Sequence, residues 1–163
     1  MQTHGNVREA YRFAEQDEGY TYVTEIYRAY TKLHEHLTPY ITELSEEACN
    51  TGMPVMRHLI LGWQDDKNVY NIEDEYTFGD AFLIAPILTK INTRDIYLPE
   101  GEWLDLNTGE EHSVGKTGLW LRDYEASLAE LPTFYNKNTV SEIAPTLTDG
   151  ITEIYDYARS VLP

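Results

Sequence analysis

The chain has 163 residues, which suffices for one ordinary domain or two small ones, and its 42% apolar content is typical of a globular protein. Its formal net charge of −16 repels polyanions, so we expect neither nucleic acid nor a membrane surface as a partner. A neutral polar ligand such as a sugar is not repelled by this charge.

The single cysteine, Cys49, excludes an internal disulfide framework. Because Cys49 falls near the end of a predicted helix without a neighbouring base, we expect it to be packed rather than nucleophilic. No apolar segment of the kind found in secretory signal peptides follows Met1, and the sequence favours a cytoplasmic protein.

The most regular pattern lies in residues 20–51 and predicts one long helix, because apolar residues recur every three or four positions. Pro39 removes a backbone donor inside this pattern and predicts a kink near residues 36–39. Gly52 is the expected C-terminal cap, and Pro54 prevents the helix from continuing. The apolar positions are Val23, Ile26, Tyr27, Tyr30, Leu33, Leu37, Tyr40, Ile41, Leu44 and Ala48.

Residues 54–61 (PVMRHLIL) form a nearly continuous apolar run, which predicts a strand covered on both faces. A long helix, a tight turn and a buried strand make up one unit of an (α/β) barrel. Since one unit cannot close a barrel, we expect these residues to be the end of a larger domain.

Short strands separated by turns follow from residue 79 onward. Phe82–Leu88, Asp95–Pro99 and Glu102–Leu106 are the clearest of them, and their even spacing is typical of an antiparallel sandwich. One more strand is expected around Leu119–Leu121.

Two further strands are expected near the C-terminus. Pro132 at the start of Leu131–Tyr135 indicates an edge strand. Residues 151–157 (ITEIYDY) alternate and fit a last strand or a short helix, of which we favour the strand. The expected fold is therefore α+β by content, with the end of a (β/α)8 barrel in residues 1–78 and an antiparallel β-sandwich in residues 79–163.

The sequence indicates no metal or cofactor site. None of the five histidines is paired with another histidine or with Cys49 at the spacing of metal ligands. The stretch from Gly109 to Lys116-Thr117 lacks the glycine that precedes the lysine of a phosphate loop.

Paired carboxylates are the remaining catalytic option. The two acids of a retaining glycosidase flank a pocket at about 5–5.5 Å from each other. The candidates are Asp65-Asp66, Glu73-Asp74-Glu75 and Asp80. Neighbouring acids in polar loops are expected to be solvated, and Asp80 is expected to cap the turn into the following strand.

Seven strings taken together resemble glycoside hydrolase family 31, the α-glucosidase and α-xylosidase family of retaining enzymes. The resemblance covers roughly residues 1–135, in the order and spacing of the family. The strings are Met1–Gly5 (MQTHG), Arg8–Phe13 (REAYRF), Leu37–Gly52 (LTPYITELSEEACNTG), Pro54–Leu59 (PVMRHL), Asp65-Asp66, Glu75–Leu88 (EYTFGDAFLIAPIL) and Asp95–Gly109 (DIYLPEGEWLDLNTG).

The resemblance implies a layout and a role for this chain. Family members have an N-terminal β-sandwich, a (β/α)8 barrel and one or two C-terminal β-sandwiches, and this chain resembles only the last barrel elements and the first of those sandwiches. The catalytic aspartates of the family lie on earlier barrel strands, so the resemblance implies that no catalytic residue is present here. His4 matches the histidine that hydrogen-bonds the sugar in the −1 subsite.

The sequence departs from the family pattern at three places. Ala10-Tyr11 stand where the family often has Pro-Trp, His58 stands where a proline is usual, and Asn136–Asn138 replace a Val-Arg-x-Gly continuation. These positions bear on sugar specificity and on how the sandwich ends.

Three hypotheses follow. In the first, the chain is part of a retaining α-glycosidase that acts on α-linked oligosaccharides or glycosides, is inactive alone, and pairs with the missing N-terminal part or with itself. In the second, it is a non-catalytic module that binds carbohydrate or a protein through Trp103, Trp120 and Tyr135, aromatics that core packing would also explain. In the third, it is a degenerate product whose exposed helix face promotes self-association.

Overall fold

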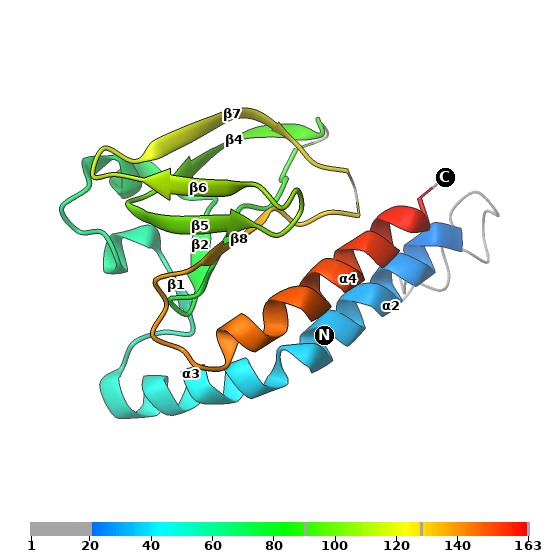
Figure 1. The fold of residues 1–163 in the computed structure, drawn as a ribbon, viewed down its shortest axis with the longest axis horizontal. Coiled ribbons are helices and arrows are strands. Elements are labelled where there is room, and N and C mark those ends of the chain that lie inside the picture. Colours follow the sequence, from blue (N-terminus) through cyan, green and yellow to red (C-terminus); the bar gives the residue numbers. More distant parts are fainter. Residues whose placement is uncertain (1–20, 90, 128, 163) are drawn as a thin grey trace, which may run out of the picture.

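The computed structural model describes residues 21–162 apart from Lys90 and Leu128, and this part folds into three layers (Figure 1). Helices α2 (Thr21–His36), α3 (Thr38–Thr51) and α4 (Thr148–Ser160) form one outer layer. A six-stranded antiparallel sheet lies in the middle, and a two-stranded sheet covers its other face. None of the helices in these residues is long and apolar enough to cross a membrane.

The long helix is interrupted where the sequence predicts a kink. One α-helix ends at His36 and the next begins at Thr38, with Pro39 in its first turn, where a missing N–H costs nothing. Gly52 closes α3 with φ 79°, and its N–H donates to the carbonyl of Ala48. Both the kink and the glycine cap are thus confirmed.

The six-stranded sheet has the order β1-β2-β3-β8-β5-β6, and the smaller sheet pairs β4 with β7. The strands are β1 (Met56–Arg57), β2 (Tyr76–Phe78), β3 (Phe82–Ile84), β4 (Thr93–Leu98), β5 (Gly101–Asp105), β6 (Glu111–Val114), β7 (Leu119–Glu125) and β8 (Thr133–Asn136). The span from 107 to 128 therefore holds two strands where the sequence predicts one.

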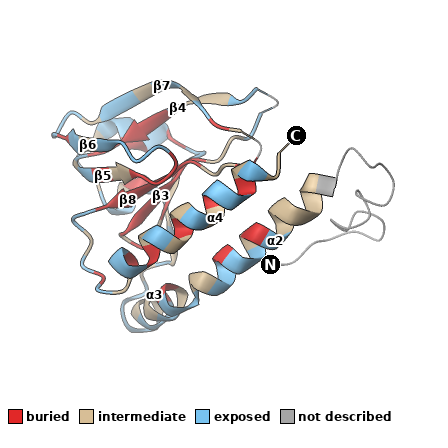
Figure 2. Cartoon of the chain, turned by 45° about the vertical axis from the view of Figure 1, so that its right-hand side comes forward, coloured by how far each residue is buried: buried red, intermediate tan, exposed pale blue. Residues whose placement is uncertain are grey.

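Side-chain alternation on β3 divides the core in two. Phe82 and Ile84 face the helices and pack with Tyr40 of α3, whereas Leu83 faces the two-stranded sheet and packs with Trp103. Figure 2 shows buried residues along β3 and β8 and on the helix sides turned toward them. Each large side chain buried in this way stabilises the fold by about 1.5–3 kcal/mol.

The strand predicted for residues 54–61 is wrong over most of its length. Only Met56–Arg57 pair with β2, and a 3-10 helix, η2 (Leu59–Leu61), follows directly. The ring of His58 accepts a hydrogen bond from the Ile60 N–H and so caps this helical turn. Met56 is 58% exposed, because β1 forms the edge of the sheet. An apolar run alone does not distinguish a strand from a short helix.

The last predicted strand is also wrong, because residues 148–160 form helix α4. Ile151, Tyr155 and Ala158 are buried at helical spacing, while Glu153 and Tyr157, which a strand would have put on the same side as Ile151, are exposed. Figure 1 shows α4 side by side with α2. The local pattern of residues 151–157 fits either a strand or a helix, and packing against the neighbouring helix α2 favours the helix.

The edge position predicted for residues 131–135 is wrong as well. Strand β8 lies between β3 and β5 inside the sheet. Pro132 precedes the strand, and its carbonyl accepts a hydrogen bond from Ala85, so no ladder donor is lost.

Mixed helix and antiparallel sheet content is as expected. The barrel end and the boundary between residues 78 and 79 stay predictions. Strands β1 and β2 precede that boundary and lie in the same sheet as β3 and β8.

Candidate functional site

Asp66, one of the candidate acids, caps a 3-10 helix, η3 (Lys67–Asn71). Its Oδ1 accepts a hydrogen bond of 3.0 Å from the Asn68 N–H, and its Oδ2 accepts one from the Tyr97 hydroxyl. Asp65 beside it is exposed. Asp66 is therefore engaged in folding this loop.

Glu75 is the most deeply buried candidate acid, with 3% of its surface exposed. Its Oε1 accepts hydrogen bonds from the Tyr97 N–H at 3.0 Å and from Arg94 Nη2 at 3.1 Å, and Arg94 also pairs with Asp74. Burial raises the pKa of Glu75 to about 7, against the opposing effects of the Tyr97 N–H and the Arg94 guanidinium. This carboxylate fastens β4 to the segment before β2.

Asp80 lies in the turn between β2 and β3 and holds three segments together. Its carboxylate accepts hydrogen bonds from Thr139 Oγ1 at 2.8 Å, from the Val140 N–H at 2.8 Å and from the Tyr40 hydroxyl at 3.4 Å. Asp66, Glu75 and Asp80 are thus each engaged by donors of the fold, in three different places. Asp65 and Glu73 are exposed.

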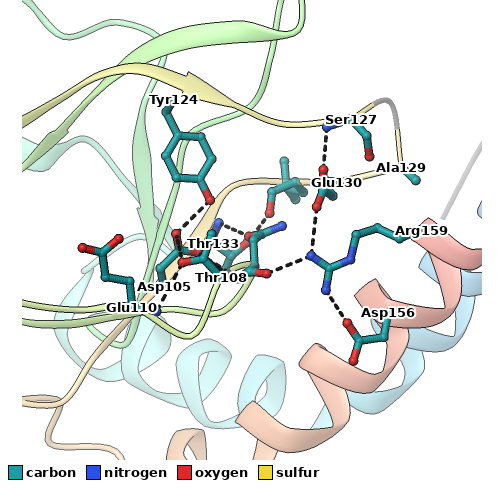
Figure 3. A network of polar contacts seen from close by, with 12 residues as sticks. Asp105, Thr108, Glu110, Tyr124, Ser127, Ala129, Glu130, Thr133, Asp156 and Arg159 are labelled. Atoms are coloured by element: carbon teal, nitrogen blue, oxygen red, sulfur yellow. Dashed lines mark hydrogen bonds and ion pairs between the residues drawn. The ribbon is translucent and has the colours of Figure 1, made fainter.

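A polar network joins helix α4 to the sheet (Figure 3). Asp105 is buried at the end of β5, where its Oδ2 accepts hydrogen bonds of 2.8 Å from the Thr108 hydroxyl and the Tyr124 hydroxyl. Burial and the adjacent Asp105 carboxylate raise the pKa of Tyr124, so the phenol stays a donor.

Arg159 of α4 forms the other half of this network. Its Nη1 donates to the Asn107 carbonyl at 2.8 Å and to Glu130 at 3.0 Å, and its Nη2 pairs with Asp156. Figure 3 shows the guanidinium between Glu130 and Asp156. Arg159 is thus paired with Glu130 and Asp156, while Asp105 accepts hydrogen bonds from uncharged donors. We interpret the network as a structural connection between the helix layer and the sheets.

Two hollows adjoin the indole of Trp63, which follows η2. One has a volume of about 320 Å³ and is lined by Arg57, Asn136 and Asn138 among others. The other has a volume of about 560 Å³ and is lined by Gln64 and other polar residues. Both volumes fall within the range of ordinary ligand sites. Nothing in the sequence singled out Trp63, because a lone aromatic beside a polar loop has no distinctive spacing.

The three aromatic residues considered as a binding surface differ in their exposure to solvent. Trp103 and Tyr135 are buried in the core, with 1% and 8% of their surface exposed. Trp120 is 38% exposed on β7, with the guanidinium of Arg122 4.5 Å from its ring centre.

Cys49 is exposed at the end of α3, so the prediction that it is packed is wrong.

His4, the predicted sugar contact, lies outside the described residues, and its role stays a prediction. Among the residues that are described, no group of three or more His, Cys, Asp or Glu side chains could hold a metal ion.

Comparison with known proteins identifies the family. Residues 52–140 match the model of the glycosyl hydrolase family 31 C-terminal domain. The chain belongs to this family. The resemblance read from the sequence is therefore confirmed.

Relatives from family 31 are much longer than this chain. It is 39% identical over 137 residues to alpha-glucosidase 2 of Bacillus thermoamyloliquefaciens, covering 83% of this chain and 17% of the relative. It is 29% identical over 160 residues to an alpha-xylosidase of Saccharolobus solfataricus, covering 96% of this chain and 20% of the relative. The chain thus spans a fifth or less of the length of these two enzymes.

Solved family 31 structures contain the same fold. An alpha-xylosidase from a soil metagenome, complexed with xylose, matches with a TM-score of 0.71 and 31% identity over 88% of this chain and 20% of that one. A dextranase of Flavobacterium johnsoniae, complexed with isomaltotriose, matches with a TM-score of 0.72 and 32% identity over 83% of this chain and 16% of that one.

Proposed function

We propose that this chain is part of a retaining α-glycosidase that removes terminal α-linked sugars by double displacement, with both catalytic aspartates outside the chain. The observation that carries this proposal is the family match over residues 52–140, in a chain that spans a fifth or less of enzymes with this activity. Three of the candidate acids, Asp66, Glu75 and Asp80, are held in separate places by Tyr97, Arg94 and Thr139.

In this proposal the chain completes and supports the catalytic domain. Residues 1–78 form the end of the barrel, and His4 contacts the sugar. The Arg159 network joins helix α4 to the sheets, and the contact of Asp80 with Tyr40 ties the sheet to helix α3 of that end. The working partner is the missing N-terminal part of the enzyme or a second copy of the chain, and the site of action is the cytoplasm.

The proposed substrate class is an α-linked oligosaccharide or glycoside. Neighbouring structures were solved with isomaltotriose, isomaltose and cycloalternan, which supports this class without naming the sugar for this chain. The net charge of −16 agrees with an uncharged substrate.

The test is an assay on nitrophenyl α-glucoside and α-xyloside. The purified chain is expected to give no turnover alone and to restore turnover when combined with the polypeptide encoded immediately upstream. A chain carrying His4→Ala should bind that polypeptide but restore less activity. Turnover by the pure chain would contradict the proposal, as would a partner whose activity is unchanged by the chain.

A non-catalytic binding module is the second candidate. It now depends on Trp120, because Trp103 and Tyr135 are buried in the core. Loss of glycan binding in Trp120→Ala, without any activity in the combined assay, would favour this candidate.

A further inference from the structure

We infer that the two hollows beside Trp63 are one binding site for an α-linked oligosaccharide, with the indole as the surface on which a sugar ring stacks. The sugar class rests on the proposed function, whereas the site itself rests on the geometry of this chain. Gly62, Trp63 and Glu100 line both hollows, so the indole lies at the boundary between them.

The indole of Trp63 is held in place from two sides. Its Nε1–H donates to the Glu100 carbonyl at 2.9 Å, and its ring lies against the buried Trp103 with 5.9 Å between ring centres. Trp63 itself is only half-buried. An aromatic ring that is oriented before the ligand arrives binds without the cost of ordering a mobile side chain.

The walls of the hollows carry both donors and acceptors. In the smaller one, the Oδ1 of Asn138 accepts the Glu102 N–H at 2.9 Å, which fixes its amide, and its Nδ2 donates to no other described residue. Gln64, Asp65 and Lys116 line the larger one. A sugar hydroxyl is both donor and acceptor, so a wall that mixes amides with charges of both signs suits it.

The lining argues against two other ligand classes. Asp65, Asp66 and Glu100 outnumber Lys116 in the larger hollow, so an anion would be repelled. An apolar ligand would leave the charged groups desolvated without partners. A separate cavity of about 190 Å³ between helices and sheet, lined mainly by Leu33, Phe82 and other apolar residues, differs clearly in character.

The first test is a titration of the full chain with isomaltotriose, followed by NMR of the indole and side-chain amide N–H groups. We expect saturable shifts of the Trp63 indole and of the Asn138 amide, with the Trp120 indole as an internal control that does not move. Cellotriose, which is β-linked, is expected to cause much smaller shifts. Shifts confined to Trp120, or equal responses to both trisaccharides, would overturn the inference.

Variants give the second test. Trp63→Ala is expected to weaken isomaltotriose binding about tenfold or more, as befits the loss of a central aromatic contact. Trp120→Ala distinguishes this site from the binding module that depends on Trp120. It removes another partly exposed indole and should leave the affinity unchanged if the site lies at Trp63, whereas loss of binding in Trp120→Ala alone would overturn the inference. Because Trp63 packs on Trp103, Asn138→Ala provides a variant outside that contact and should weaken binding about threefold to tenfold, as expected for one hydrogen bond.

Unchanged affinity in both Trp63→Ala and Asn138→Ala would overturn the inference. Its failure is distinct from that of the proposed function. If isomaltotriose does not bind while the chain restores α-glycosidase activity to the upstream polypeptide, the site is disproved and the function stands. If isomaltotriose binds at Trp63 but no activity is restored, the site stands and the glycosidase proposal falls.

Discussion

The two faces of the six-stranded sheet are fastened by the same device, which makes them directly comparable. Tyr40 on the helix side and Tyr97 on the other side are both fully buried. The hydroxyl of each meets an aspartate, Asp80 or Asp66. Each hydroxyl also lies against a glycine of positive φ, Gly79 at 62° or Gly118 at 68°.

The two devices differ in what the tyrosine hydroxyl supports. The Tyr40 hydroxyl accepts the buried Ala81 N–H at 3.2 Å, so it completes the backbone at the start of β3. The Tyr97 hydroxyl accepts the Asn68 amide at 3.1 Å, and Asn68 is an exposed residue of η3. Loss of the Tyr40 hydroxyl would therefore leave a buried main-chain N–H without an acceptor. Loss of the Tyr97 hydroxyl would free the side-chain amide of Asn68, which water can reach.

The largest loss of stability is expected for Gly79→Ala. A Cβ at this position would overlap the Tyr40 hydroxyl and lie 2.7 Å from Leu44 Cδ2, at a φ that favours glycine. Strain and overpacking together should lower the free energy of unfolding by about 3–5 kcal/mol. Urea unfolding followed by circular dichroism measures this loss.

Gly52→Ala is the control for that experiment. Gly52 has a similar φ of 79°, but no atom lies within 4 Å of the added Cβ. It should cost only about 1–2 kcal/mol, from backbone strain alone. Equal losses at Gly79 and Gly52 would show that the contact with Tyr40 is unimportant.

The next largest effect is a dependence of stability on pH, which we assign to Glu75 on the Tyr97 side of the sheet. The pKa of Glu75 is about 7 in the folded chain against 4.5 for the free side chain, so the folded state holds this proton more tightly. Its contribution to stability is fully present below about pH 4.5 and is lost as the pH rises through about 7. Between about pH 5 and pH 8 the free energy of unfolding should fall by on the order of 3 kcal/mol.

Glu75→Gln is the variant that isolates this effect, because the amide cannot ionise. Arg94 and Asp74 are the charged groups nearest to it and are unchanged in the variant. The Asp123 N–H and Arg122 lower the pKa of Asp95, which therefore titrates below this window. Thermal unfolding across the pH range should give a flatter curve for Glu75→Gln, and parallel curves would contradict the assignment.

The smallest losses of stability are expected when the hydroxyl of Tyr40 or of Tyr97 is removed. Tyr40→Phe leaves the buried Ala81 N–H without its acceptor and should cost about 1–3 kcal/mol, whereas Tyr97→Phe should cost about 0.5–1.5 kcal/mol, because Asn68 can turn to water. Chemical denaturation of the two variants, with Tyr70→Phe as an exposed control, measures the difference. A larger loss for Tyr97→Phe would reverse the comparison.

Sequence reasoning succeeded where a local pattern and a local cause coincide. The period of residues 20–51, interrupted by Pro39 and ended by Gly52, fixed the helices. It failed where tertiary contacts decide. Residues 151–157 alternate like a strand, yet burial of Ile151, Tyr155 and Ala158 makes them a helix.

The candidate site was harder to predict than the fold. Motif resemblance identified the family, but the engagement of Glu75 by Arg94 and Tyr97 joins segments some twenty residues apart and leaves no mark on any one segment. Trp63 gained its importance only when folding brought Asn138 and Glu100 to its sides. The predicted contact between His4 and the sugar depends on the family resemblance alone.

The most direct measurement of the proposed function traps the glycosyl–enzyme intermediate in the proposed complex with the upstream polypeptide. A retaining enzyme forms a covalent bond between sugar and carboxylate, and a fluorinated α-glycosyl inactivator holds that bond long enough for peptide mass spectrometry. The account predicts that the label lies on an aspartate of the upstream polypeptide and that all 163 residues of this chain are unlabelled. A glycosyl adduct on any carboxylate of this chain would contradict it.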